Sequence, residues 1–91
     1  MDYRTQLESL TTLSMNAITR ACAGEGLNAL LTQCYDEYLE LRELAEEALT
    51  DTTPETREYY MQEAAAWRDT ARVLNEMRAE RTAAVRAAES A

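Results

Sequence analysis

The residues of this chain with the greatest capacity for chemistry are its carboxylates. Seventeen of the 91 residues are Asp or Glu. Four of them share one face of an expected helix at spacings of three or four positions: Asp36, Glu40, Glu43 and Glu47. Side chains at this spacing lie about 5 to 6 Å apart. Carboxylate oxygens suit hard cations such as Mg²⁺, and a row of negative charge also suits a basic protein surface. We call these four residues the acidic rail.

Other catalytic chemistry is excluded by what the composition lacks. The chain has no His, which removes imidazole bases, Cys–His pairs and histidine metal ligands. Its two glycines, Gly24 and Gly26, form no phosphate-binding loop or dinucleotide motif. We therefore expect a protein-binding role rather than an enzyme, with no cofactor and no metal.

One stretch of the acidic rail resembles a motif of a family of magnesium enzymes. All-helical nucleotide pyrophosphohydrolases of the MazG type use acidic residues on helices, and the string ELRELAEE at residues 40–47 is similar to their first acidic motif. The resemblance implies a magnesium site at Glu40, Glu43 and Glu47. The second motif of that family, Glu-x-x-Asp on the following helix, is absent because Ala66 stands three residues before Asp69. Carboxylates opposite a core face also have no wall around them to form a pocket.

The two cysteines, Cys22 and Cys34, fall on apolar faces of expected helices. In a tight antiparallel pair of helices, they would lie about 9 Å apart along the axis, which is too far for a disulfide. We expect two buried free thiols, as in a reducing compartment. The N-terminus does not resemble a signal peptide, and no apolar run reaches the length of a membrane span. A cytoplasmic location is expected.

Three helices, near residues 3–23, 27–49 and 54–88, are expected to position these groups. The second carries the most regular apolar seam, opposite the acidic rail. This seam consists of Leu27, Leu31, Cys34, Tyr38, Leu41, Ala45 and Ala48. Tyr35 and Leu39 widen the apolar arc, so this helix should touch two neighbours. The pattern predicts one all-α domain over residues 1–91, folded as an antiparallel three-helix bundle.

The ends of these helices have local signals. Asp2 is the expected N-cap of the first helix, and Gly24 is the left-handed residue expected to end it. Pro54 suits the first position of the third helix. Thr11 and Ser14 fall inside the first helix, where a hydroxyl can bond the carbonyl one turn back.

The third helix is expected to reach about 50 Å, against about 30 to 35 Å for the other two, so its end must overhang. Its core stripe consists of Tyr60, Ala64, Trp67, Ala71 and Leu74, and is interrupted by Arg78 and Arg81. A second seam consists of Tyr59, Ala66, Val73, Met77, Ala84 and Ala88. This seam is either the edge of a broad buried arc or a surface for self-association or target binding. The overhang favours a homodimer formed through this helix.

Charge is distributed unevenly along the chain, whose net charge is −8. Residues 1–35 contribute −1, residues 36–63 contribute −8 and residues 64–91 contribute +1. A charge run opposite a core face is commonly a solvated face. The sharper interpretation is that the acidic rail and Asp51 bind a protein partner with a basic surface. The negative balance argues against direct binding of nucleic acid or of an anionic membrane.

These features lead to three alternative functions. The first is a small acidic inhibitor that blocks a basic, nucleic-acid-binding protein, by analogy of size and charge with phage-encoded anti-CRISPR proteins and DNA mimics. The carboxylate spacing of the rail is close to the phosphate spacing of a DNA strand. The second is a structural, assembly or chaperone-like homodimeric module that binds through its apolar seams. The third is the magnesium-dependent pyrophosphohydrolase.

Overall fold

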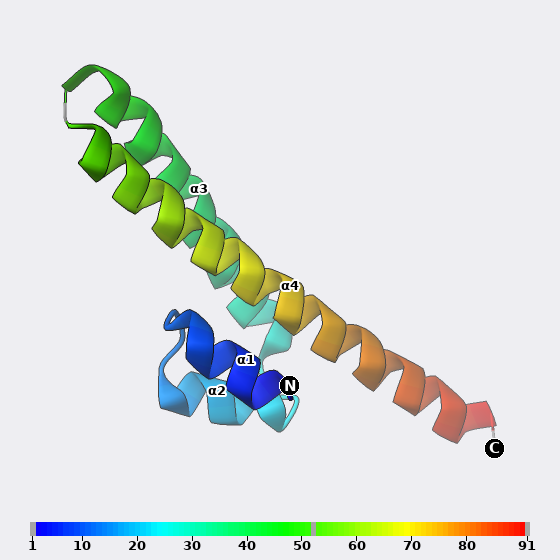
Figure 1. Cartoon of the computed structure of the whole chain (residues 1–91). Coiled ribbons are helices and arrows are strands. Elements are labelled where there is room, and N and C mark those ends of the chain that lie inside the picture. Colours follow the sequence, from blue (N-terminus) through cyan, green and yellow to red (C-terminus); the bar gives the residue numbers. More distant parts are fainter. Residues whose placement is uncertain (1, 52, 91) are drawn as a thin grey trace.

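The computed structural model describes residues 2–51 and 53–90, apart from the side chains of residues 49–51. This part of the chain contains four helices: α1 (Tyr3–Leu10), α2 (Met15–Cys22), α3 (Leu27–Asp51) and α4 (Pro54–Ser90). Helices α3 and α4 form a long antiparallel hairpin, and the short helices α1 and α2 pack near the start of α3 (Figure 1). The all-α prediction is confirmed.

The continuous first helix predicted over residues 3–23 is wrong, because residues 11–14 divide it into α1 and α2. Thr11 adopts a left-handed conformation with φ 55°, and its amide donates to the carbonyl of Glu8, which ends α1. The side chain of Ser14 accepts a hydrogen bond of 3.1 Å from the amide of Ala17 and caps α2. Both residues were expected inside one helix, and they terminate two helices instead.

The α1–α2 connection is fastened to the middle of α4 by a pair of threonines. The Thr70 hydroxyl donates to the carbonyl of Ala66 at 2.8 Å, so the Thr12 hydroxyl is the donor in the 2.6 Å bond between the two threonines. The Thr70 side chain is completely buried, and a buried hydroxyl is costly unless it is bonded. The contact therefore fixes where the short helices lie on α4.

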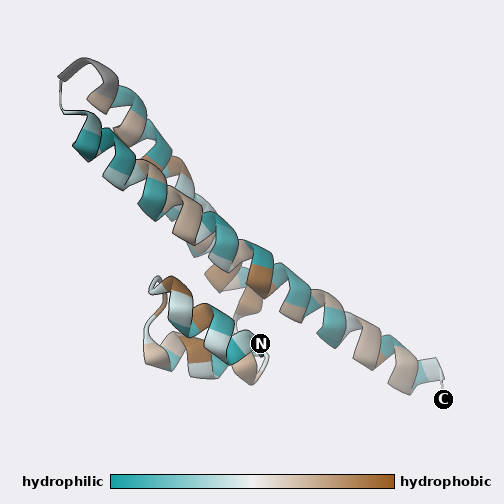
Figure 2. Cartoon of the chain, viewed as in Figure 1, coloured by the Kyte–Doolittle hydropathy of each residue, from teal (hydrophilic) through white to brown (hydrophobic). Residues whose placement is uncertain are grey.

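The hydrophobic core lies where the four helices meet, and Figure 2 shows apolar residues concentrated there. It consists of Leu7 from α1, Ile18 and Ala21 from α2, Leu27, Leu31 and Cys34 from α3, and Ala71, Val73, Leu74 and Met77 from α4. Towards the turn of the hairpin the buried side chains are the alanines Ala45, Ala48 and Ala64. These small side chains each bury little apolar area.

Several predicted helix ends are confirmed. Asp2 accepts a 2.7 Å hydrogen bond from the Thr5 amide, which lowers the pKa of the Asp2 carboxyl. Gly24 has a φ of 79°, and its amide donates to a carbonyl of the last turn of α2, as in a Schellman motif. Pro54 begins α4, which continues to Ser90, two residues beyond the predicted end.

The predicted burial of several apolar residues is not found. Tyr35 and Leu39 of α3 are 48% and 58% exposed, because α4 is the one helix against which α3 packs extensively. Tyr60 and Trp67, expected in the core stripe of α4, are partly buried. Trp67 packs at the edge of the core.

The two thiols have different surroundings. Cys34 is buried, as predicted, and burial raises the pKa of its thiol to about 11, with a smaller contribution from the charge of Glu37. Cys22 was expected to be buried but is exposed. It is the last residue of α2, where the chain leaves the core for the connection to α3.

Replacing Leu74 by Ala should lower the free energy of unfolding by about 2 to 5 kcal/mol, because this completely buried side chain would leave a cavity. The control Val85→Ala, in an exposed part of the same helix, should change it by less than about 0.5 kcal/mol. Urea unfolding followed by circular dichroism measures both. A loss below about 1 kcal/mol for Leu74→Ala would contradict the position of the core.

The native chain should offer one reactive thiol to Ellman's reagent. The thiolate is the reacting form, and with a pKa of about 11 only about a thousandth of Cys34 is ionised near pH 8. Exposed Cys22 should react promptly, and Cys34 only after denaturation. The variant Cys22→Ser should therefore show no prompt reaction, and prompt release of one equivalent from it would place Cys34 at the surface.

Candidate protein-interaction surfaces

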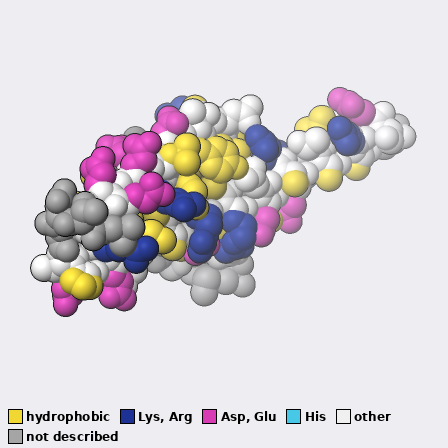
Figure 3. Space-filling model, turned by 90° about the horizontal axis from the view of Figure 1, so that it is seen from above, with side chains coloured by type: hydrophobic (Ala, Val, Ile, Leu, Met, Phe, Trp, Pro, Cys, Tyr) yellow, Lys and Arg dark blue, Asp and Glu magenta, His cyan; other side chains and the backbone are white. Residues whose placement is uncertain are grey.

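The acidic rail lies on the side of α3 that faces away from α4, since the buried seam of α3 is opposite it. Asp36, Glu40, Glu43 and Glu47 are all exposed. Figure 3 shows acidic side chains gathered around the hairpin end of the molecule. The side chain of Asp51 lies outside the described residues. The role of the rail and Asp51 in binding a basic partner stays a prediction.

The rail is not part of a carboxylate cluster within the described residues. Among the described residues, no three His, Cys, Asp or Glu side chains come together in a way that could hold a metal ion. Glu40, Glu43 and Glu47 share a helix face, but no second helix brings carboxylates to them. The structure thus gives no support to the magnesium site implied by the pyrophosphohydrolase resemblance.

The second seam predicted on α4 is divided by the fold. Val73 and Met77, with exposed fractions of 0% and 7%, belong to the core of the chain itself. The short helices α1 and α2 pack against them, and their part in self-association stays a prediction. Ala84 and Ala88 are exposed beyond the core. The remaining two members, Tyr59 and Ala66, are exposed and partly buried respectively.

The last third of α4 extends past the rest of the molecule. Helix α4 has 37 residues and α3 has 25, so α4 is longer by 12 residues, or about 18 Å. Residues 78–90 are all exposed; we call them the projecting segment. Val85 is the largest apolar side chain there, 54% exposed, and Ala83, Ala84, Ala87 and Ala88 surround it in sequence. The first residues of the segment still lie beside other elements, since Arg81 contacts Gly24 and Ala84 lines a shallow pocket together with Tyr3.

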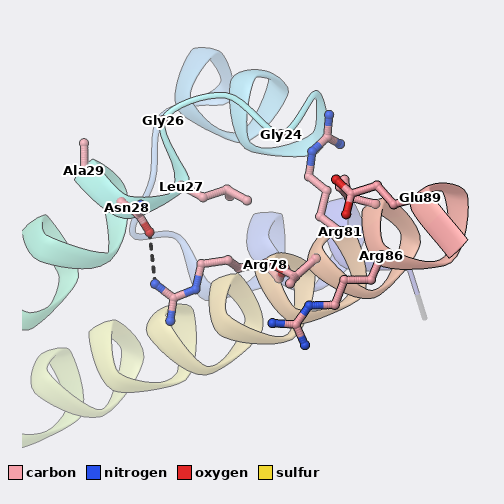
Figure 4. A pocket seen from close by; sticks show the side chains of 11 residues that line it. Gly24, Gly26, Leu27, Asn28, Ala29, Arg78, Arg81, Arg86 and Glu89 are labelled. Atoms are coloured by element: carbon pink, nitrogen blue, oxygen red, sulfur yellow. Dashed lines mark hydrogen bonds between the residues drawn. The ribbon is translucent and has the colours of Figure 1, made fainter.

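A cleft of about 620 Å³ lies at the base of the projecting segment. It is bordered by the connection at Gly24 and Gly26, by residues 27–29 at the start of α3, and by residues 78–89 of α4. Figure 4 shows Arg78 reaching to Asn28, Arg81 rising towards the connection, and Arg86 on the open side. We call this the arginine cleft.

Two local features position the arginines. Arg78 donates to the Oδ1 atoms of Asn28 at 3.0 Å and Asn75 at 2.9 Å, which joins the start of α3 to α4. The guanidinium of Arg81 lies directly against Gly24, in space that a Cβ atom would occupy. Glycine is therefore favoured at position 24 for two reasons: its φ is positive, and a side chain there would collide with Arg81.

Sequence patterning does not point to the arginine cleft, because Arg78 and Arg81 look like the end of a core stripe. The available signal is electrostatic: residues 64–91 carry a net charge of +1 in a chain whose total is −8. The convergence of these arginines with the Gly24–Gly26 connection depends on the antiparallel hairpin. It could not be derived from spacing along α4 alone.

Comparison with known proteins identifies the family. The sequence model of Chap-C, the TY-Chap C-terminal domain, matches residues 1–88, which include α1, α2, α3 and nearly all of α4. The chain belongs to the TY-Chap C-terminal domain family. No curated protein and no solved structure matches it.

Membership in this family favours one of the three predicted functions. Chap-C is a chaperone-type helical domain, so a protein partner and the chaperone-like alternative gain support. Neither the family nor the structure supports the inhibitor hypothesis, with its phage and DNA-mimic analogies. Across the described residues, no helix has the length and apolar character needed to cross a membrane.

Replacing Glu40 and Glu43 by Gln should raise the free energy of unfolding by about 0.2 to 0.5 kcal/mol for each like-charge pair relieved along the rail. Urea unfolding at low salt measures the change, and at about 1 M salt the difference from the native chain should vanish because the repulsion is screened. A destabilisation above about 1 kcal/mol would show that these carboxylates make attractive contacts within the fold.

Proposed function

We propose that this chain is a chaperone-like binding module that holds a helical segment of a partner protein against the projecting segment of α4. The observation that carries the proposal is that α4 continues for 13 exposed residues, 78–90, beyond its last buried residue, Met77. Short helices without tertiary contacts are marginally stable in water. A partner helix packed on this face would supply the contacts that α3 supplies to the rest of α4.

The chemistry of the segment suits a helix as the occupant. Ala84 and Ala88 allow close approach of a second helix on the face that also carries Val85, which provides an apolar anchor at the centre. The interface is small, so the binding should be reversible and dependent on a few side chains. Reversible capture of an exposed helix is what a chaperone-type domain requires, and this agrees with the family match.

A second copy of the chain is the other possible occupant. Ala84 and Ala88 remain exposed from the seam predicted for self-association, and an antiparallel pair of projecting segments would cover them. We favour the partner protein, because the burial of Val73 and Met77 interrupts that seam and separates Ala84 and Ala88 from its exposed member Tyr59.

Site-specific photocrosslinking tests this function. A photoreactive amino acid placed at Val85 should crosslink a discrete partner polypeptide in the cell that makes the protein, and the same probe at the exposed Gln62 should not. The further substitution Ala84→Glu, which keeps helix propensity but places a charge on the face, should abolish the crosslink. The matched control Ala83→Glu lies about 100° around the helix from Ala84 and should preserve it.

Other outcomes would overturn the proposal. Crosslinks between two copies of the chain alone would identify the homodimer. Equal crosslinking from positions 62 and 85 would show that the projecting segment has no special role. The substitutions are in an exposed helical segment, so circular dichroism should show an unchanged fold.

A further inference from the structure

The arginine cleft has an unusual charge balance for so acidic a chain. Arg78, Arg81 and Arg86 all border it, and Glu89 is the one acidic residue among the residues that line it. The chain as a whole has 17 acidic and nine basic residues. A third of the basic residues therefore meet in one cleft.

These three arginines are not neutralised within the described part of the chain. Arg4, Arg20, Arg68 and Arg72 each lie within 4.0 Å of a carboxylate oxygen. Arg78, Arg81 and Arg86 have no such contact to a described carboxylate. Arg78 is held by two neutral amide oxygens, which orient its guanidinium without cancelling its charge. The cleft therefore retains donors and positive charge for an outside group.

The residues around the three arginines also favour a negatively charged ligand. The first turn of α3 borders the cleft and carries no acidic residue, so the partial positive charge of the helix start is not offset there. The apolar residues Leu27 of α3 and Val85 of α4 also line the cleft. A ligand that fits has carboxylates next to apolar groups.

We propose that the arginine cleft binds the carboxylates of an acidic, amphipathic helical segment of the partner protein. Guanidinium groups bind carboxylates through paired, charge-assisted hydrogen bonds. The cleft opens onto the projecting segment, so one peptide contacts the apolar face and the arginines together. The inference rests on the proposed function, since it specifies the chemistry of the segment held there.

A designed peptide provides the probe. It is a fluorescein-labelled helix of about 15 residues, long enough to cover the projecting segment, built from Leu, Ala and Glu; its matched partner has Gln at every Glu position. Fluorescence anisotropy with the full chain should show tighter binding of the Glu peptide at low salt, with the advantage lost as salt rises. The Gln peptide should bind weakly and without salt dependence.

The variant Arg78→Gln, Arg81→Gln, Arg86→Gln should weaken binding of the Glu peptide roughly tenfold, because each exposed pair contributes a few-fold and three are lost. The matched control Arg57→Gln, Arg68→Gln, Arg72→Gln changes net charge equally in the earlier half of α4 and should bind within about twofold of the native chain. Thermal unfolding should confirm that both variants fold.

The outcomes separate the two proposals. Equal binding of the Glu and Gln peptides would overturn carboxylate recognition, while the crosslink from position 85 would still support capture of a helix. Equal weakening in both triple variants would show that the peptide responds to net charge and not to the arginine cleft, which would overturn the inference. Displacement of the Glu peptide by inorganic phosphate at low millimolar concentration, at constant ionic strength, would identify a small-anion site instead. Binding of neither peptide would also overturn the inference.

Discussion

Two adjacent residues of α4, Val73 and Leu74, are both completely buried. Neighbouring side chains on a helix point about 100° apart, so both can be buried only where the helix is covered on two sides. Helix α3 provides one cover, and the α1–α2 pair provides the other, held in place by the bond between Thr12 and Thr70. The burial of both residues therefore depends on the place where all four helices meet. On either side of it, α4 has fewer buried contacts.

Away from the meeting point, α4 loses its neighbours in steps. Towards the turn of the hairpin it packs on α3 alone, through alanines such as Ala45 and Ala64 that bury little apolar area. Beyond Met77, in the other direction, all its residues to Ser90 are exposed, and its neighbours are the Gly24–Gly26 connection and the start of α3. Local stability follows the density of buried contacts, so we expect the four-helix meeting point to be the most stable part of this 59 Å long molecule.

Charge separates along the same axis. The acidic excess of residues 36–63 lies towards the hairpin turn, and the arginines of the cleft lie at the base of the projecting segment. Exposed carboxylates keep an elongated helical chain soluble and discourage self-pairing at the hairpin end. The opposite end combines an uncovered helix with donors for carboxylates. This arrangement suits a chaperone-type domain that must bind part of another protein without binding its own acidic end.

The sequence by itself determined the features that depend on neighbours along the chain: the helical class, the hairpin from α3 to α4, the Asp2 cap and the start at Pro54. Helix periodicity and capping act over a few residues, so their signals are local. Tertiary structure decided the break after α1. Threonine and serine hydroxyls can bond the backbone inside a helix as well as at its end, and the contact of Thr12 with a residue 58 positions away favours the break. Tertiary structure also decided that Val73 is buried in the core, and that no described carboxylate pairs with the cleft arginines. Burial and ion pairing are set by distances between segments, which the spacing of residues along one helix does not contain.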